Sequence, residues 1–347
     1  MILRADARAI PLRDESVQCV VTSPPYWGLR DYGTPGQLGL CKTPEEYVAN
    51  MVAVFHEVRR VLKDDGVLWL NLGDSYAQSG KGGNPVGSEW VGFVGNKDRE
   101  KTAMHRPSKA ADIGLKPKDL VGIPWRVAFA LQADGWYLRS DIIWSKPNPM
   151  PESVTDRPTK AHEYIFLMSK SAKYFYNAEA IKEDAGPFHA GGADNALDLP
   201  KTPDPRKKQD ALGKPTYTGF NAIYKARKPA GWNTAEGPHG SFHPDGRAQE
   251  VEYGDIGERR NKRTVWSIAT QPYSGSHFAT FPEEIPRLCI LAGSKPGDVI
   301  LDPFGGSGTT SKVAHELGRK PVHIDLTYHE LARKRMTTTP AMAGLMG

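Results

Sequence analysis

The stretch LDPFGGSGTT, residues 301–310, predicts the fold of this chain. The apolar residues Val299, Ile300 and Leu301 predict a buried strand that ends at Asp302, and residues 309–317 predict a helix. Between them lies a glycine-rich turn, which lets the backbone approach a ligand closely. The first turn of the helix offers N–H groups that have no partner within the helix. We therefore predict an α/β fold with a ligand-binding turn in this part of the chain.

The ligand of this turn can be narrowed from the residues around it. The strand expected at 321–325 ends in Asp325, about twenty residues after the turn, where an acid can accept both hydroxyls of a ribose. A phosphate-binding P-loop needs GxxxxGK[ST], which is absent, and a dinucleotide fingerprint needs a third glycine after Gly306 and Gly308. S-adenosylmethionine has no pyrophosphate, and Asp302 could hold its ammonium group. This third ligand fits best.

The second informative stretch is TSPPYW, residues 22–27, which follows an apolar run at 17–21. The run predicts a buried strand. Two adjacent prolines fix φ and stiffen the backbone directly after it, and two aromatic residues follow. A rigid, aromatic corner is an unusual way to leave a sheet and indicates a specific role.

The segments around these stretches predict alternating strands and helices. The predicted helix 44–62 has Thr43 as its N-cap and Glu46 as its capping-box partner. Residues 64–66 are expected to turn the chain into a strand at 67–70. Further predicted elements are a strand at 2–3, a helix at 120–133, a strand at 137–144, a hairpin of 164–168 with 174–176, and helices at 285–292 and 331–336.

The apolar strands also predict the kind of sheet. Continuous apolar runs suit a parallel sheet that is covered on both faces. We expect one antiparallel strand at an edge, either after Tyr137 or near Phe175.

Composition limits the class of protein. A chain of 347 residues allows a core plus an accessory region, and a net charge of +5 is compatible with a polyanionic partner without proving one. The 3 cysteines are widely spaced and the 10 histidines show no HExxH pattern, so we expect neither a disulfide framework nor a metal site. No apolar run is long enough to span a bilayer and the N-terminus lacks a signal pattern, so we expect a cytoplasmic protein.

Two segments interrupt the alternation. Residues 76–118 carry eight Lys or Arg against four Asp or Glu, and a loop of this length is usually functional or disordered. Residues 181–270 contain few large apolar residues, with basic clusters at 206–208, 225–228 and 259–263 and aromatic residues between them. This pattern favours a nucleic-acid surface that orders on binding, although a flexible polar insertion would have the same composition.

The two stretches together resemble the motifs of the amino-group DNA methyltransferases, which methylate the exocyclic nitrogen of cytosine or adenine. Their catalytic signature [DNS]PP[YFW] matches SPPY at 23–26, and the order of catalytic motif before cofactor motif resembles the permuted beta class. The resemblance implies a three-layer, Rossmann-like α/β fold that is circularly permuted and carries an inserted DNA-recognition region. It divides the chain into a first catalytic part at 1–180, which includes the basic loop 76–118, a target-recognition region at 181–270, and a second catalytic part at 271–347.

The resemblance also implies the site residues. The catalytic residues would be Ser23, Pro24, Pro25 and Tyr26. The cofactor S-adenosylmethionine would contact Asp6, His277, Phe278, Asp302, Phe304, Gly305, Gly306, Ser307, Gly308, Thr309 and Asp325. DNA contacts would come from Trp27, Arg30, Lys146, Asn148, Arg206, Lys207, Lys208, Arg227, Lys228 and Arg260. Residues 144–149 and 162–164 resemble later motifs around the target-base pocket, whereas 76–118 matches no motif.

The chemistry that the resemblance implies explains the rigid corner. An exocyclic amine conjugated to its ring is a poor nucleophile, and Ser23 Oγ and the Pro24 carbonyl would each accept one of its N–H groups. Tyr26 would stack on the base, which must be flipped out of the double helix. Trp27 would extend this stacking wall or belong to the core. Because Ser heads the motif more often in N4-cytosine enzymes, we expect cytosine N4 as the target, with adenine N6 as the alternative.

Other classes of protein explain less of the sequence. A carbon-5 cytosine methylase usually has its nucleophilic cysteine after a proline, and none of Cys19, Cys41 and Cys289 follows one. RNA or protein methyltransferases usually carry a similar NPPY after the cofactor motif. A non-catalytic DNA-binding module would more often lose the pocket or the turn, and a nicotinamide oxidoreductase gives TSPPYW no role. We expect double-stranded DNA as the partner, with no membrane and no metal, and leave open a homodimer and a restriction endonuclease counterpart.

Overall fold

The computed structural model of the protein describes residues 1–29, 36–77, 114–184, 207–209, 215–217, 259–271 and 281–337. The strands are β1 (Ile2–Leu3), β2 (Val17–Thr22), β3 (Leu62–Leu72), β4 (Tyr137–Ser145), β5 (His162–Ser169), β6 (Glu183–Asp184), β7 (Lys207–Gln209), β8 (Pro215–Tyr217), β9 (Arg259–Arg260), β10 (Val265–Ser267), β11 (Val299–Asp302) and β12 (Lys320–Ile324). The helices are α1 (Pro44–Val61), α2 (Ile123–Ala133), α4 (Glu284–Gly293), α5 (Thr309–Glu316), α6 (His329–Thr337) and the short 3-10 helix η2 (Glu179–Ile181).

By its internal contacts the chain divides into two units, residues 1–183 with 261–347, and residues 184–260. In the second unit, β7 pairs antiparallel with β8. That unit lies inside the predicted recognition region 181–270, whose role stays a prediction. Residues 265–267 of that predicted region belong to the first unit, where they form the edge strand β10 of the large sheet.

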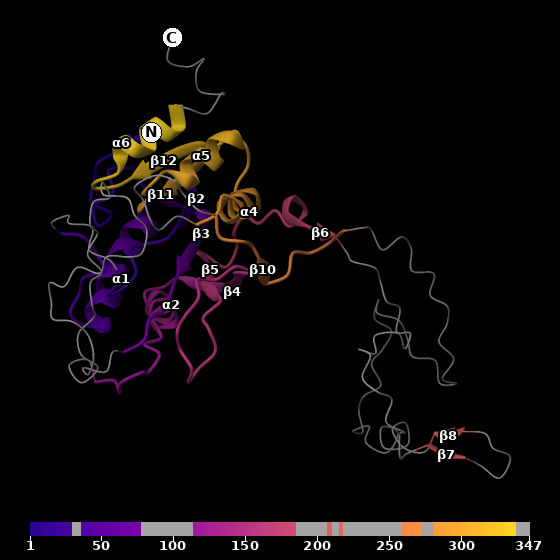
Figure 1. Cartoon of the computed structure of the whole chain (residues 1–347). Helices are drawn as coiled ribbons and strands as arrows, with labels where there is room; N and C mark the ends of the chain where they lie inside the picture. Colours follow the sequence, from indigo (N-terminus) through magenta and orange to yellow (C-terminus); the bar gives the residue numbers. More distant parts are fainter. Residues whose placement is uncertain are drawn as a thin grey trace, which may run out of the picture. The chain divides into compact units, whose positions relative to one another are not determined.

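The first unit is built around one sheet of eight strands in the order β1-β12-β11-β2-β3-β5-β4-β10 (Figure 1). Neighbouring strands are parallel except that β5 runs antiparallel to both β3 and β4. The mostly parallel sheet is confirmed, but the prediction that the reversed strand lies at an edge is wrong. The predicted hairpin of 164–168 with 174–176 is also wrong, because β3 and β4 occupy both sides of β5. The Phe175 N–H instead donates to Asp65 O at 2.8 Å.

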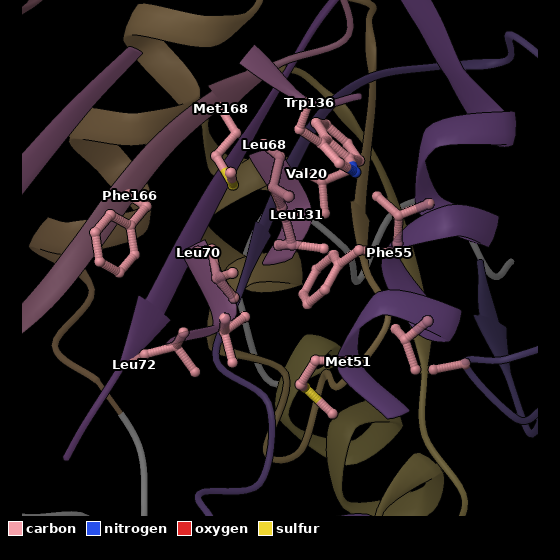
Figure 2. Close-up of a cluster of buried hydrophobic side chains, with 14 of the residues drawn as sticks. Val20, Met51, Phe55, Leu68, Leu70, Leu72, Leu131, Trp136, Phe166 and Met168 are labelled. Atoms are coloured by element: carbon pink, nitrogen blue, oxygen red, sulfur yellow. The ribbon is translucent and has the colours of Figure 1, made fainter. Parts of the chain in front are cut away.

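Each central strand supplies two cores, one on each face of the sheet. On β2, Val20 packs into the core beneath α1 and α2, whereas Cys19 and Val21 pack into the core beneath α4 and α5. The same alternation holds on β3, where Leu68 and Leu70 lie on the first face. Figure 2 shows the first core, in which strand side chains meet those of the helices. Successive apolar residues along a strand therefore serve both cores, and the predicted three-layer arrangement is confirmed.

Helix α1 begins where the sequence predicts. Thr43 Oγ1 accepts the Glu46 N–H at 3.2 Å, and a proline stands in the first turn. The capping box differs in its second half, because Glu46 Oε2 accepts the N–H of Lys42, at 3.0 Å, in place of that of Thr43.

The turn predicted at 64–66 does not precede the strand, because these residues lie within β3. Strand β3 already begins at Leu62, which pairs with Val17, and the next pair is Cys19 with Val67. Residues 63–66 are therefore an irregularity within the strand, opposite the single residue Gln18.

The N-terminal strand completes one edge of the sheet. β1 pairs parallel with β12, in the register Ile2 with His323 and Leu3 with Ile324. The Asp325 N–H donates to Leu3 O at 3.2 Å, so Asp6 and Asp325 follow adjacent strands at the same end of the sheet. This is the position that the permuted order of motifs predicts for the strand leading to Asp6. Among the described residues, no helix has both the length and the apolar character that a membrane span requires.

The cores give a stability prediction with a matched control. Phe55 on α1 is 0% exposed and Phe129 on α2 is 56% exposed. Replacing Phe55 by Ala leaves a cavity and should lower the free energy of unfolding by about 3–5 kcal/mol. Phe129→Ala loses a ring contact with Trp125, at 5.4 Å between centroids, and should cost below about 1.5 kcal/mol. Urea unfolding followed by tryptophan fluorescence checks both, and equal losses would contradict the assignment of the core.

Candidate active site

A cavity of about 740 Å³ lies at the carboxyl ends of the parallel strands. Parallel strands end at the same edge of a sheet, so this edge collects residues that are far apart in the sequence. At or after the ends of β1, β2, β11 and β12, the residues that line the cavity include Asp6, Ser23, Pro24, Pro25, Tyr26, Asp302, Phe304, Gly305, Gly306, Ser307, Thr309 and Asp325. The structure therefore brings together the SPPY corner, residues 23–26, and the predicted cofactor motif.

Asp302 joins the two motifs by direct hydrogen bonds. Its Oδ1 accepts from Thr22 Oγ1 on β2, at 2.7 Å, and its Oδ2 accepts from Thr310 Oγ1 on α5, also at 2.7 Å. The Phe304 N–H donates to Oδ1 at 3.1 Å. Burial raises the pKa of this carboxyl to about 6. Asp302 lines the cavity, so it can contact an ammonium group of a ligand. Its hydrogen bond to Thr22 also fixes the end of β2 against the end of β11.

The glycine loop, residues 305–308, has a shape that side chains would obstruct. A Cβ at Gly305 would lie 2.1 Å from Nδ1 of the buried His323, so this residue must be glycine. Gly306 and Gly308 have φ values of 48° and 83°, in the left-handed region that favours glycine. Gly308 is the N-cap of α5, so the loop leads directly into that helix N-terminus.

Asp325 and Asp6 follow the two neighbouring strands β12 and β1. Oδ2 of Asp325 accepts the Gly306 N–H at 3.0 Å, and Oδ1 accepts the N–H groups of Thr327 and Tyr328 at 2.7 Å. The Arg8 guanidinium bonds Asp6, with Nη2 at 2.7 Å from Oδ2, and lowers the pKa of this carboxyl. Both acids are thus held in fixed orientations at the rim of the glycine loop.

The charge of the cavity around the glycine loop discriminates between classes of ligand. The acidic half, formed by the lining residues among 5–7, 302–310 and 325–328, contains the three carboxylates of Asp6, Asp302 and Asp325. None of these described lining residues is Lys or Arg, and Arg8, which pairs with Asp6, does not line the cavity. Such a surface would repel a pyrophosphate and favours a ligand with positive charge and a ribose. The residues therefore fit S-adenosylmethionine, which carries a sulfonium and an ammonium group.

The SPPY corner is held from behind by a residue that the sequence did not indicate. The hydroxyl of Tyr47, fully buried on α1, donates to the Pro25 carbonyl at 2.9 Å. The Gly28 N–H donates to Gly39 O at 2.8 Å, and a Cβ at Gly39 would lie 3.0 Å from Tyr26 O. The sequence predicts the helix that carries Tyr47, but not that this tyrosine reaches the corner.

The ring of Tyr26 is held through its hydroxyl and along one edge. Its hydroxyl donates to Glu163 Oε2 on β5, at 2.5 Å, and lies 3.1 Å from Asn71 Oδ1 on β3. A Cβ at Gly73 would lie 2.4 Å from Tyr26 Cε2, so a glycine is required against the ring. Asn71 and Gly73 were missed in the sequence; polar residues and a glycine where a continuous apolar strand ends are the signal that could have found them.

Three residues predicted to contact DNA have other partners in the structure. Trp27 is 1% exposed and its Nε1–H donates to Cys41 O at 3.0 Å, which corrects the stacking-wall interpretation in favour of the core. Lys146 lines the cavity, pairs with Glu163 and lies over the ring of Trp144 at 4.3 Å. The side chain of Asn148 bonds the backbone of Thr270 through both its oxygen and its nitrogen.

The structure places only some of the other predicted site residues. Arg260 is exposed on β9. The backbones of Lys207 and Lys208 lie in β7, and their side chains are outside the description. Arg30, Arg206, Arg227, Lys228, His277 and Phe278 lie outside the described residues. Among the described residues, no group of three or more His, Cys, Asp or Glu side chains could hold a metal ion.

The fold and the site together define a class of enzyme. A sheet with one reversed strand, an acidic half that fits S-adenosylmethionine and an adjoining rigid corner are the parts of an S-adenosylmethionine-dependent methyltransferase. Residues 17–334 match the family model N6_N4_Mtase, described as DNA methylase, so the chain belongs to this family. It is an S-adenosylmethionine-dependent DNA methyltransferase that acts on an amino group, and the resemblance noted in the sequence is confirmed.

Relatives support this assignment over nearly the whole chain. The chain is 44% identical over 339 residues to the Type II methyltransferase M.SmaI of Serratia marcescens, covering 96% of this chain and 90% of that protein. It is 41% identical to M.Cfr9I of Citrobacter freundii, covering 92% and 81%. The solved PvuII DNA methyltransferase, named as cytosine-N4-specific, has the same fold, with a TM-score of 0.55, 15% identity and coverage of 98% and 86%. A putative DNA modification methylase of Thermus thermophilus, solved with S-adenosyl-L-methionine, gives a TM-score of 0.51 at 20% identity, covering 97% and 92%.

The contact between Gly73 and Tyr26 predicts a selective defect. Gly73→Ala should push the Tyr26 ring aside and slow methyl transfer by about ten- to a hundred-fold, because the corner is misplaced, while S-adenosylmethionine still binds. Gly318→Ala is the control: its φ is +74° with no atom within 4 Å of the added Cβ, so it should cost about 1 kcal/mol of stability and leave the rate unchanged. Single-turnover rates and cofactor titrations distinguish the two, and a normal rate in Gly73→Ala would contradict the contact.

The raised pKa of Asp302 predicts a pH dependence of stability. Between its usual pKa of 3.8 and about 6, the folded protein keeps a proton that the unfolded chain has lost. The contribution of Asp302 to the free energy of unfolding therefore falls as pH rises through this window, by roughly 3 kcal/mol in total. Urea unfolding of the wild type and Asp302→Asn from pH 4 to 7 checks it. The difference, wild type minus variant, should fall with rising pH, and parallel curves would refute the buried ionisation.

Proposed function

We propose that this enzyme methylates N4 of cytosine at a specific site in double-stranded DNA, with the target base flipped out of the helix. The observation that carries the proposal is Ser23 at the head of the corner, in the cavity where the acidic half meets residues of β3 and β5. Serine at this position resembles the N4-cytosine branch of the family, and the PvuII enzyme, whose name states the same specificity, has this fold.

The corner supplies the geometry that a poor nucleophile needs. The Ser23 hydroxyl and the Pro24 carbonyl would accept the two N–H groups of the target amine, which directs its lone pair away from the ring. Both prolines restrict the backbone, and Tyr47 fixes the carbonyl of the next residue, Pro25, so the two acceptors would have little freedom to move. The face of the Tyr26 ring would support the flipped base.

The acidic half supplies the other reactant. S-adenosylmethionine provides a methyl group on a positively charged sulfur. Asp325 and Asp6 would hold its nucleoside end, and Phe304 with Gly305, Gly306 and Ser307 of the glycine loop would approach it closely, since each of these residues lines the cavity. His277 and Phe278 remain candidates for the methionine end. The carboxylate of Asp302, next to the corner, would favour the positive charge of the reactive end.

Recognition of the DNA sequence is proposed to reside in residues 181–270. The basic clusters of this region, including Arg206, Lys207, Lys208, Arg227, Lys228 and Arg260, suit phosphate contacts, and Arg30 lies close to the corner in sequence. Affinity for DNA should then fall as salt rises. The relatives are named Type II methyltransferases, which favours a restriction endonuclease of the same specificity as the cellular counterpart.

Adenine N6 is the alternative target. Adenine and cytosine both carry an NH2 group beside a ring nitrogen, so Ser23 and Pro24 could accept from either. The difference between the bases is decided by the shape of the cavity around the ring, and the mechanism would be unchanged.

Product analysis tests the proposal. The purified enzyme is incubated with unmethylated genomic DNA and labelled S-adenosylmethionine, and the digested nucleosides are identified by mass. N4-methylcytosine is the expected product; N6-methyladenine would replace the base but keep the mechanism. Ser23→Ala should abolish transfer with cofactor binding intact, whereas Asp325→Ala should weaken cofactor binding. Bound cofactor without label in DNA would overturn the proposal.

A further inference from the structure

A chain of polar groups leads from the corner to a carboxylate on β5. Ser23 Oγ lies 3.4 Å from the Tyr26 hydroxyl, which lies 2.5 Å from Glu163 Oε2. Glu163 in turn pairs with Lys146, and Asn71 Nδ2 donates to Glu163 Oε2 at 3.2 Å. All five residues line the cavity. The methyltransferase signature admits Phe or Trp in place of Tyr26, so stacking on a base needs only the ring, and the hydroxyl must be explained separately.

The direction of each hydrogen bond follows from the number of protons. Tyr26 has one hydroxyl proton and two acceptors, and Glu163 at 2.5 Å is closer than Asn71 Oδ1 at 3.1 Å. Burial raises the pKa of Tyr26 well above its usual value, and the neighbouring Glu163 adds to this effect, so the hydroxyl keeps its proton. With that proton directed to Glu163, the tyrosine oxygen is an acceptor for Ser23.

The consequence reaches the reacting amine. When Ser23 donates its own proton to Tyr26, both lone pairs of Ser23 Oγ are available to the amine N–H. If the serine proton pointed the other way, it would compete for the amine lone pair that must attack the methyl group. The distance of 3.4 Å from Ser23 to Tyr26 is long for an O–H···O bond, and such bonds commonly tighten when the substrate is bound.

We propose that Glu163 is a positioning residue for methyl transfer, which acts through the Tyr26 hydroxyl to hold Ser23 as a hydrogen-bond acceptor and to take up the proton that the amine releases. This inference rests on the proposed role of Ser23. The ammonium of Lys146, paired with the carboxylate and lying over Trp144, keeps Glu163 in place. A Gln at this position could preserve the hydrogen bonds but not the negative charge.

The proton balance closes along the same chain. Transfer forms the nitrogen–carbon bond, breaks the carbon–sulfur bond and leaves the amine with a positive charge and one proton too many. That proton passes to Ser23 Oγ, the serine proton to the Tyr26 oxygen, and the tyrosine proton to Glu163 Oε2. The products are a neutral methylated amine and a neutral Glu163, which returns its proton to water that enters the cavity. No other co-reactant is required.

A double-mutant cycle tests the inference. Glu163→Gln, Tyr26→Phe and the double variant are compared with the wild type by single-turnover methyl transfer at saturating DNA and cofactor. We expect each single variant to be slower by about ten- to a hundred-fold, with the affinities for DNA and S-adenosylmethionine within about two-fold of the wild type. Because Glu163 acts through the tyrosine hydroxyl, the double variant should be no slower than Tyr26→Phe alone. Glu316→Gln, in a salt bridge with Arg287 away from the cavity, is the control and should transfer at the normal rate.

Each other outcome contradicts a definite part of the inference. Additive losses in the cycle would mean that Glu163 acts on the substrate directly and not through Tyr26. A Glu163→Gln variant with a normal rate would mean that only the hydrogen bonds matter. If Glu163→Gln does not fold, Tyr26→Phe still decides, because a normal rate without the hydroxyl refutes the chain. An inactive wild type would instead contradict the proposed function, so the two failures are distinguishable.

Discussion

The site depends on one buried carboxylate. Asp302 accepts hydrogen bonds from Thr22 and Thr310, two residues that are 288 positions apart in the sequence, and thereby fixes the end of β2 against the first turn of α5. A buried carboxylate without such donors would be strongly destabilising, and even with them its pKa is raised to about 6. The protein tolerates this cost at the point where the corner proposed to hold the amine meets the loop proposed to hold the methyl donor. Any change in the spacing of β2 and β11 would therefore act on both reactants at once.

The sheet explains why so distant residues can meet with this accuracy. Every strand that delivers a group to the acidic half is parallel to its neighbours, and each ends at the same edge. The strands are covered on both faces, so alternate residues of β2 pack into different cores, and neither face is free to slide. The N-terminal β1 pairs with β12, which places Asp6 beside Asp325 although they stand near opposite ends of the sequence. The permuted order of motifs changes the connections and leaves the arrangement of the strands intact.

The sequence predicts what local patterns encode. Continuous apolar runs predict the strands, and Thr43 with Glu46 predicts the start of α1, because each of these signals is local in the sequence. Pairing partners are not local, so β5 was assigned to the wrong neighbour and its interior position was missed. Trp27 could not be assigned to core or pocket, because it stands in a loop, where no periodicity shows which way a side chain points. The contact between Tyr26 and Glu163 was not predicted for a related reason, although both residues belong to stretches assigned to the site: they are 137 positions apart, and only the folded sheet brings them together.

The SPPY corner behaves as part of the framework although it belongs to no helix or strand. Tyr47 on α1 holds the Pro25 carbonyl, Gly73 after β3 makes room for the Tyr26 ring, and Glu163 on β5 receives its hydroxyl. These three elements are themselves fixed by the core beneath α1 and by the pairing of β3 with β5. A loop restrained from three directions has little conformational freedom left to lose when a substrate binds, and the entropy that ordering would cost has already been lost during folding. The two prolines add to this restraint but cannot account for it, because they fix φ at two positions and leave the direction of the Tyr26 ring undetermined. The rigidity that methyl transfer requires is thus a property of the whole sheet, and it reaches the corner through the contacts of Tyr47, Gly73 and Glu163.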